Sequence, residues 1–397
     1  MSEEKVMKVI CSQKSLVNGT QIVQKAISTK LGLPIYSGIL FEVTSDNRIH
    51  LFSTDLEIGI DYYIPAQVVE GGAIVIPSKI FSDLIRKFPE GNIEIEADKD
   101  SIIYIKEEDL SNYKILGFSA DDFSPFPEIQ SKVKIRLTHK ILKDTIQEVI
   151  FASSRDENRS FLNGILFKRT EKGLEVAATD SHRLALKKIK LTGKNTIEAV
   201  DSQFEVIIPQ RALSELFKLL NFEDESIVEI DIGEKQIIFV LNLEGEKNKI
   251  RLFSRIIDGQ YPDYHQIIPQ QFKTTIKIDT EEFRQKMERI ILFVKEDLNT
   301  IKMETHLYGE SKGEDRGELI IKAKTPDIGD ACEQIPCLIE GEYIEIAFNS
   351  RYITDVLRVI KTDQTEIKLN ENLNPVIIRP IEKEEQYGYV LMPVRMD

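Results

Sequence analysis

The sequence predicts an α+β protein built from three similar domains, each with two helices and antiparallel sheets. The chain of 397 residues is too long for one ordinary domain. The same order of strands and amphipathic helices returns three times along it. The strands are spaced as in hairpins, and few are separated by a crossover helix, which favours antiparallel over parallel sheets.

The first repeated element is a short strand followed by a capped helix. Its three copies span residues 6–27, 133–152 and 275–294. Each has an alternating strand, one small polar residue at the turn and a helix with a single apolar face. Because a side-chain oxygen can accept a free N–H of the first helical turn, Ser12, Thr138 and Asp279 are predicted to cap these helices.

The second repeated element is a pair of strands. Residues 35–55 and 161–180 both contain Gly-Ile-Leu-Phe, a polar turn, a second strand and a final Thr-Asp pair. The glycines, Gly38 and Gly164, are 126 residues apart, and the Thr-Asp pairs are 125 apart. A third copy begins at Met303 with a longer turn and Thr-Pro-Asp. The pattern predicts a hairpin of half-buried strands.

The third repeated element is a strand, a short polar break and a helix of about three turns. Its copies span residues 73–88, 205–220 and 343–360. Pro77 and Pro209 suit a helix start, where the missing N–H costs nothing.

Two proline-containing segments end the first two repeats. Phe126-Pro127 and Tyr261-Pro262 are 135 residues apart, and proline interrupts helices and central strands. They predict an N-terminal domain at 1–129, a central domain at 130–271 and a C-terminal domain at 272–397. Duplication alone does not close a circle, so three domains in a row without a ring remain possible.

Charge is segregated along the chain. The net charge of −14 argues against binding to nucleic acid. The predicted helices nevertheless carry 16 basic and 8 acidic residues, and the rest of the chain carries 36 basic and 58 acidic ones. A basic helical face would contact phosphates without reading sequence. Ordinary helix surfaces also carry Lys and Arg, so this pattern alone does not decide. The six helices are predicted at 14–30, 78–88, 139–152, 210–220, 280–295 and 350–360.

Composition limits the class of protein further. No stretch approaches the ~20 apolar residues of a membrane span, and the charged N-terminus does not resemble a signal peptide. The cytoplasm is therefore expected. Cys11, Cys332 and Cys337 have neither zinc-site spacing nor the number that a disulfide framework needs. Cys332 and Cys337 are interpreted as ordinary strand residues, and no cofactor or metal is expected.

The motif search gives no support for catalysis. Phosphate-binding loops, HExxH and GxSxG are not found. His182 has Ser and Asp neighbours in sequence, but a triad is assembled in space, so a structural or binding role is favoured. Asp121 and Asp122 could suggest a metal, although a solvated turn is favoured.

Two segments suggest a binding surface. One is residues 260–268, and the other is the apolar run from Tyr389 to the C-terminus. The run could be a groove for partner peptides, because flexible Met side chains accept several ligands. From physics alone, a buried last strand is favoured.

These segments carry a family resemblance that covers essentially the whole chain. The chain resembles the beta sliding clamps of bacterial DNA polymerase III in the segments ADDFSPFP, FLNGILF, ATDSHRLAL, IIPQRALSEL, IDGQYPDYHQIIP and YVLMPVRM. The resemblance implies a DNA clamp fold and a head-to-tail ring dimer of six domains. It implies a non-catalytic processivity factor that encircles duplex DNA and tethers the replicative polymerase.

The resemblance also implies partners and site residues. Expected partners are duplex DNA, a second copy of the chain, the polymerase alpha subunit, the clamp loader, repair polymerases and mismatch repair proteins. A pocket for short linear motifs would be formed by Leu162, Thr179, His182, Arg183, Leu184, Pro262, Ile267, Asn349, Tyr352, Val390, Met392, Pro393, Val394, Arg395 and Met396. The candidate DNA contacts are Lys30, Lys79, Arg86, Arg155 and Arg211. At the dimer interface, Tyr113 and Ile115 would meet Leu292 and Phe293 of the second subunit.

The chain departs from the family pattern at a few positions. Ser181 replaces a common glycine, Gln266 stands where some relatives have Arg, and Asp397 extends the usual terminus. The loop at 308–317 is longer and more acidic. These departures concern peptide specificity rather than the class of protein.

Three other functions are weighed against the clamp. A non-ring scaffold would bind partners without DNA. A nuclease would need a carboxylate cluster, which the motif search does not find. A specialised clamp paralogue cannot be separated from the main replicative copy by sequence.

Overall fold

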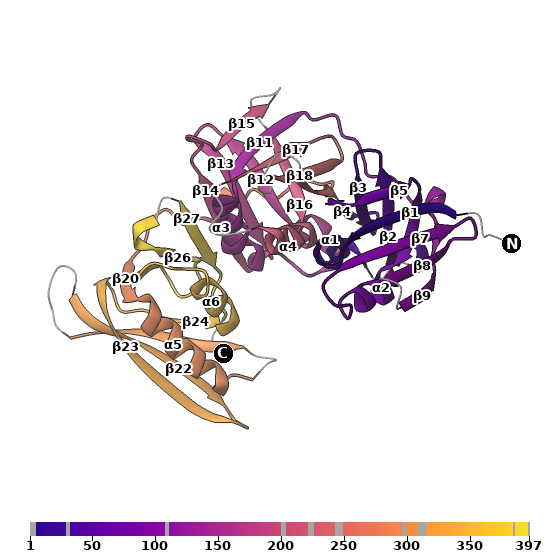
Figure 1. The fold of residues 1–397 in the computed structure, drawn as a ribbon. Helices are drawn as coiled ribbons and strands as arrows, with labels where there is room; N and C mark the ends of the chain where they lie inside the picture. Colours follow the sequence, from indigo (N-terminus) through magenta and orange to yellow (C-terminus); the bar gives the residue numbers. More distant parts are fainter. Residues whose placement is uncertain are drawn as a thin grey trace. The chain divides into compact units, whose positions relative to one another are not determined.

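The computed structural model describes residues 5–28, 32–107, 111–199, 204–220, 226–242, 249–295, 299–308, 315–383 and 386–395. The chain forms two compact units. Unit 1 comprises residues 1–143, 192–202 and 211–256, and unit 2 comprises residues 144–191, 203–210 and 257–397. The central third of the sequence therefore contributes strands to both units (Figure 1). No helix of the described residues is long and apolar enough to cross a membrane.

Unit 1 contains two antiparallel sheets. The smaller has the order β5-β1-β7-β8-β9, and the larger has the order β10-β6-β2-β3-β4-β19-β18-β17-β11-β15. The strands are β1 (Lys5–Ser12), β2 (Gly38–Thr44), β3 (Arg48–Thr54), β4 (Ile58–Pro65), β5 (Gln67–Glu70), β6 (Ala73–Pro77), β7 (Asn92–Asp98), β8 (Ile102–Glu107), β9 (Ser111–Leu116), β10 (Phe118–Ser119), β11 (Val133–Thr138), β15 (Thr196–Ala199), β17 (Ile227–Ile232), β18 (Gln236–Asn242) and β19 (Lys249–Arg255).

Unit 2 is organised by a single antiparallel sheet of twelve strands in the described residues. Its order is β16-β12-β13-β14-β27-β26-β25-β20-β23-β22-β21-β24. The strands are β12 (Gly164–Thr170), β13 (Gly173–Thr179), β14 (Arg183–Ile189), β16 (Glu205–Pro209), β20 (Thr274–Asp279), β21 (Thr300–Leu307), β22 (Asp315–Thr325), β23 (Gly329–Gly341), β24 (Glu345–Asn349), β25 (Gln364–Leu369), β26 (Val376–Pro380) and β27 (Tyr387–Leu391).

The described residues form six α-helices, in the order predicted. They are α1 (Gln13–Val23), α2 (Ser78–Ile85), α3 (His139–Val149), α4 (Gln210–Leu219), α5 (Thr280–Ile290) and α6 (Ser350–Leu357). The three predicted caps are confirmed. The hydroxyl of Ser12 accepts from Ser15 N at 3.1 Å, and that of Thr138 accepts from Ile141 N at 3.3 Å. The carboxylate of Asp279 accepts from Glu282 N at 2.7 Å.

The predicted hairpins are also present in all three copies. The pairs β2/β3, β12/β13 and β21/β22 are antiparallel. Gly38 lies opposite Pro77, and Gly164 lies opposite Pro209, so the first two copies share one register. A Cβ at Gly38 would lie 2.5 Å from Val75 Cγ1, and one at Gly164 would lie 2.4 Å from Ile207 Cγ2. Both glycines therefore leave room for a branched side chain on the neighbouring strand.

Several basic residues that the sequence predicted to lie within helices lie outside them in the structure. The observed helices contain 10 basic and 8 acidic residues. Most of the missing basic residues lie just beyond helix C-termini, where unpaired carbonyl groups attract cations. Lys25, Arg86, Lys87, Lys295 and Arg358 all follow a helix in this way, and Lys30 lies outside the described residues. Helix periodicity alone does not locate the last turn.

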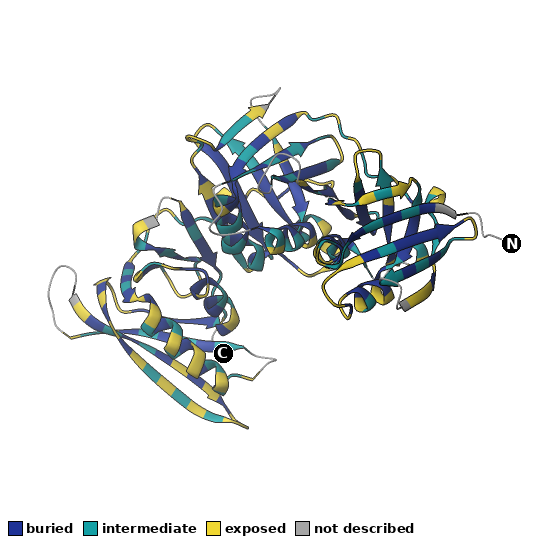
Figure 2. Cartoon of the chain, viewed as in Figure 1, coloured by how far each residue is buried: buried dark blue, intermediate teal, exposed yellow. Residues whose placement is uncertain are grey.

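Burial alternates along some strands, such as β17 and β23, whereas β13 is buried along its whole length, and the helices bury one face (Figure 2). Of the three cysteines, Cys11 and Cys337 are buried and Cys332 is exposed. Cys332 and Cys337 both lie on β23, as predicted. Burial raises the pKa of the Cys11 and Cys337 thiols to about 12, so both stay protonated at neutral pH. Asp121 and Asp122, which the sequence associates with a solvated turn, are exposed in a short 3-10 helix, η3 (Ala120–Asp122).

The pairing of β4 with β19 joins the N-terminal third of the sequence to the central third. The ring of Phe126 covers this pairing, because it packs edge-to-face against Phe52 of β3 and Phe253 of β19 with centroids 5.5 Å away in each case. The Phe126-Pro127 segment therefore packs against the sheet through its phenylalanine and is not a fully solvated linker.

A buried ion pair lies at the same joint. Asp61 on β4 has no exposed surface, and both of its oxygens accept hydrogen bonds from Arg251 on β19. His50 Nε2 lies 3.0 Å from Asp61 and His50 Nδ1 lies 3.0 Å from Glu42. The Arg251 guanidinium stacks 4.2 Å from the centroid of the Phe126 ring. A buried carboxylate is tolerated because these donors surround it.

We expect Asp61→Asn to destabilise unit 1 by about 2 kcal/mol, because Arg251 loses its buried anion while the shape is kept. Thermal unfolding of the full chain, followed by circular dichroism, measures this loss. Asp46→Asn is the matched control, since Asp46 makes exposed contacts with Arg48 and the Thr44 hydroxyl and exposed ion pairs contribute ~0–1 kcal/mol. Equal midpoints for the two variants would contradict the importance of Asp61.

Candidate functional site

The pairing of β14 with β27 brings the 179–184 loop beside the C-terminal tail. Arg183 lies opposite Leu391, and Leu184 lies opposite Val390. The tail then continues past the loop, because Met392 N donates to His182 O at 2.9 Å and Val394 N donates to Ala347 O at 2.8 Å. Residues 387–391 thus form a buried last strand, which was the favoured of the two interpretations of the C-terminal run. Met392, Pro393 and Val394 are half-buried, and Arg395 is exposed.

The loop is held in shape by its own polar groups. The Asp180 carboxylate accepts from the N–H groups of His182 and Arg183 at 3.0 and 3.1 Å. Thr179 Oγ1 donates to Arg183 O at 2.6 Å and accepts from Ser181 N at 3.2 Å. Ser181 has φ +78°, a left-handed conformation that costs a side chain about 1 kcal/mol. The loop is therefore a pre-formed turn.

A buried tyrosine fixes the start of this loop. Tyr261 Oη accepts from Thr179 N at 3.1 Å, and the residue is 6% exposed. Burial raises the pKa of Tyr261, so the phenol stays neutral at physiological pH. Tyr261 also packs in one buried cluster with Leu184 of β14 and Val390 of β27, much as Phe126 packs on the sheet beside the β4/β19 pairing. Both predicted joints are packed against a sheet.

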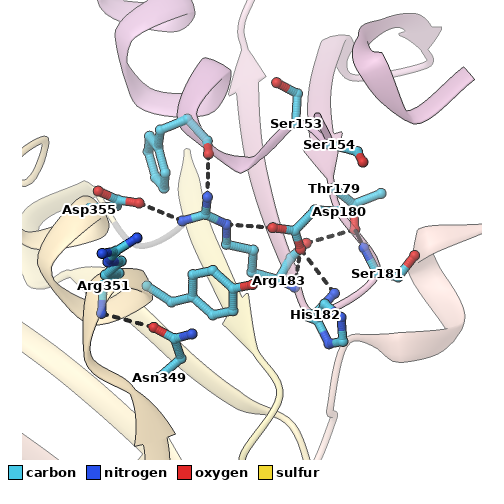
Figure 3. A network of polar contacts seen from close by, with 12 residues as sticks. Ser153, Ser154, Thr179, Asp180, Ser181, His182, Arg183, Asn349, Arg351 and Asp355 are labelled. Atoms are coloured by element: carbon cyan, nitrogen blue, oxygen red, sulfur yellow. Dashed lines mark hydrogen bonds and ion pairs between the residues drawn. The ribbon is translucent and has the colours of Figure 1, made fainter. Parts of the chain in front are cut away.

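Arg183 lies at the centre of a polar network (Figure 3). Its Nε donates to Asp180 at 2.9 Å and its Nη1 donates to Asp355 at 2.7 Å. Its Nη2 donates to Phe151 O at 2.6 Å. The guanidinium lies over the Tyr352 ring, 4.3 Å from the centroid. A planar guanidinium suits this role because it donates in several directions and stacks on an aromatic face.

A cavity of about 800 Å³ opens beside the network. Its floor is formed by Phe151, Arg183 and Tyr352, and His182 stacks against Tyr352 with ring centroids 6.5 Å apart. Its size is in the range of ligand pockets. Its lining is Phe151, Ser153, Ser154, Arg155, Asp156, Arg159, Asp180, His182, Arg183, Gln210, Ile291, Arg351, Tyr352, Thr354, Asp355 and Arg358.

The opposite face of the same sheet is apolar. Leu184 and Val390 pack with Leu186 and with Tyr261 and Tyr264 in a buried cluster. A smaller recess of about 190 Å³ adjoins it and is lined by Leu186, Ile268, Ile377 and Val390, among others. The sheet therefore presents a polar cavity on one side and an apolar recess on the other.

The predicted pocket residues divide between these surroundings. His182, Arg183 and Tyr352 line the cavity. Leu162, Leu184 and Val390 are almost fully buried, and Pro262 and Ile267 are exposed. Thr179 orders the loop, whereas Asn349 accepts from Arg351 N and so caps α6. Met396 lies outside the described residues.

Sequence reasoning missed three members of the network. Asp180 could have been identified from its place inside the loop motif. Phe151 and Asp355 carry no motif, because they reach Arg183 only through folding.

The predicted DNA contacts occupy different surroundings. Lys79 on α2 and Arg86 just after it are exposed. Arg211 forms an ion pair with Asp55, which is 3% exposed, so its charge is partly neutralised. Arg155 lines the cavity beside Arg183.

The predicted dimer residues are partly exposed. Tyr113 is 40% exposed, whereas Ile115 is 6% exposed and belongs to the core. Leu116, which the sequence did not single out, is 71% exposed. Leu292 is 72% exposed and Phe293 is half-buried.

Family models place all three thirds of the chain in one family. The N-terminal, central and C-terminal domains of the DNA polymerase III beta subunit match residues 7–127, 136–263 and 265–395. The beta sliding clamp of Bacillus subtilis is 31% identical, and the match covers 98% of this chain and 100% of the relative. That of Synechococcus elongatus is 30% identical, with the same two coverages.

Solved structures agree with these matches. The sliding clamp of B. subtilis superposes with a TM-score of 0.88 at 30% identity, covering 98% of this chain and 100% of that one. A Pseudomonas aeruginosa clamp, described as bound to griselimycin, has a TM-score of 0.85 at 25% identity with the same coverage. The fold is therefore that of a DNA sliding clamp, a non-catalytic processivity subunit. The chain belongs to the DNA polymerase III beta subunit family.

We expect Arg183→Lys to lower the stability of unit 2 by about 2 kcal/mol, because one ammonium cannot bridge two carboxylates and a carbonyl. Urea unfolding followed by tyrosine fluorescence measures the change. Arg316→Lys on β22, where the side chain is exposed, should change the stability by less than ~0.5 kcal/mol. A similar small loss at both positions would show that the network is not a structural centre.

Proposed function

We propose that the cavity beside Arg183, together with the neighbouring tail, receives short linear motifs of partner proteins. The supporting observation is the β14/β27 pairing, which gathers His182, Arg183 and Tyr352 around a pre-formed cavity next to the half-buried Met392. A rigid site lowers the entropic cost of ordering a flexible peptide. The partners are the polymerase alpha subunit, the clamp loader, repair polymerases and mismatch repair proteins.

The mechanism is topological. A closed ring of two chains cannot leave duplex DNA sideways, so weak contacts are enough to retain it. Contacts to phosphates have nearly equal energy at each position and thus permit sliding. A partner held by the ring stays at high effective concentration near the primer end. We place this activity in the cytoplasm, at the nucleoid.

The DNA contacts that we favour lie at the two ends of α2. Lys79, Arg86 and Lys87 are exposed, and within the described residues their one ion pair joins Arg86 to Asp83 at a long 3.9 Å. Lys30 remains a candidate by family resemblance. Arg211 is a weaker candidate because Asp55 already neutralises it.

The dimer contacts that we favour are apolar and exposed. Tyr113 and Leu116 would face Leu292 and Phe293 of a second copy, while Ile115 would support them from the core. We also propose domain boundaries at 129/130 and 271/272, each after one of the two aromatic-proline segments.

The experiment that tests the clamp function measures the retention of the protein on DNA. We expect a dimer at micromolar concentration that, once loaded, stays on nicked circular duplex and leaves the linearised form quickly. Leu292→Asp should give a monomer by light scattering and abolish retention, because a charge would be buried at the interface. Leu338→Asp is the control, on an exposed position of β23. A monomeric wild type that leaves both DNA forms equally fast would favour the non-ring scaffold.

A second experiment tests the pocket. Griselimycin is a suitable probe, because a related clamp has been solved with it, and overlapping peptides from the polymerase alpha subunit supply natural candidates. Removal of residues 392–397 and Tyr352→Ala should each weaken binding about tenfold or more, as at interface hot spots. The dimer should remain intact in both. Tyr308→Ala, at an exposed tyrosine just after β21 and outside the cavity lining, is the control. Unchanged affinity in the first two variants would exclude this pocket.

A further inference from the structure

The rim of the cavity carries positive charge that the network does not neutralise. Within the cavity lining, the carboxylates of Asp180 and Asp355 are both engaged by Arg183. The third, Asp156, accepts from Asn158 N and caps the 3-10 helix η5 (Glu157–Asn163). Arg155 and Arg159 flank this cap, and both are exposed. Their charges are therefore available to a ligand.

Arg159 is held by a serine in an unfavourable conformation. Its Nη1 donates to Ser181 Oγ at 3.0 Å, a neutral acceptor that leaves the cationic charge uncompensated. Ser181 has φ +78°, where glycine would be free of strain. A glycine at this position would have no hydroxyl to accept the hydrogen bond from Arg159. A strained residue next to a cavity is a common sign of a functional constraint.

We infer that Ser181 positions Arg159, with Arg155 beside it, to receive an aspartate or glutamate side chain of the bound peptide. This inference rests on the proposed peptide site and adds a specificity to it. A guanidinium pairs with a carboxylate through two parallel hydrogen bonds, which makes it selective for that group over an amide. Arg155 then contributes to the peptide site rather than to DNA. Ser181 is a positioning residue, because it acts through Arg159.

The test compares matched peptides. The probe is the tightest binder among the overlapping alpha-subunit peptides, with a second version in which each Asp or Glu is replaced by Asn or Gln. Wild type should prefer the acidic peptide by roughly threefold to fivefold at low salt, the upper range for an exposed ion pair, and lose that preference in high salt. Arg159→Gln should abolish the preference while the amide peptide still binds.

Variants of Ser181 separate positioning from strain. Ser181→Ala keeps the strained backbone and removes the hydroxyl, whereas Ser181→Gly removes both. Both should reduce the preference for the acidic peptide, and only Ser181→Gly should also raise the thermal midpoint. Arg316→Gln, an exposed arginine outside the cavity, should leave the preference unchanged.

Several outcomes would overturn the inference. Equal affinity of wild type for the two peptides would do so while leaving the peptide site itself intact. Retained preference in Arg159→Gln or in both Ser181 variants would also do so. If Arg155→Gln and Arg159→Gln weaken binding of duplex DNA but not the peptide preference, the two arginines contact phosphates instead. Failure of wild type to bind either peptide would refute the peptide site as well.

Discussion

The antiparallel pairing of β14 with β27 is the constraint on which unit 2 and its site depend. It joins a strand from the central third of the sequence to the last strand of the chain. Because the register sets Arg183 against Leu391, the loop before β14 and the tail after β27 emerge at the same edge. Tyr261 then covers the pairing and holds the loop. A slip of one residue would exchange the two faces of β27 and place Tyr389 or Leu391 opposite Leu184 instead of Val390.

A strand pairing that joins two repeats, with an aromatic residue packed against it, occurs twice in the molecule. The β4/β19 pairing joins the N-terminal and central thirds, and Phe126 covers it as Tyr261 covers β14/β27. Sheets that continue from one repeat to the next remove exposed edges, which would otherwise offer unpaired N–H and C=O groups to other chains. The two joints differ in their polar content. One buries Asp61 beneath Arg251, whereas the other places Arg183 between two carboxylates in the lining of a cavity.

The site combines rigidity with uncompensated charge. Asp180, Thr179 and Tyr261 fix the loop before any ligand arrives, so little ordering remains to be done on binding. The guanidinium of Arg183 is engaged by Asp180, Asp355 and the carbonyl of Phe151, so it shapes the cavity rather than pairing with a ligand. Arg155 and Arg159 remain at the rim. In a chain with net charge −14, such local cationic groups stand out against an acidic surface and steer acidic segments toward them.

The sequence by itself determined the repeated order of strands and helices, the three helix caps and the paired glycines, because these follow from local periodicity and from side chains acting on their own backbone. Through family resemblance it also predicted Arg183 as a residue of the peptide pocket. Only the tertiary structure decided where the helices end and thus that the basic residues follow them. It also decided that Ile115 and Leu184 are core residues, that Arg155 lines the cavity, and that Asp355 and Phe151 complete the Arg183 network. These facts depend on contacts between residues far apart in sequence, such as Arg183 and Asp355, and no local pattern encodes them.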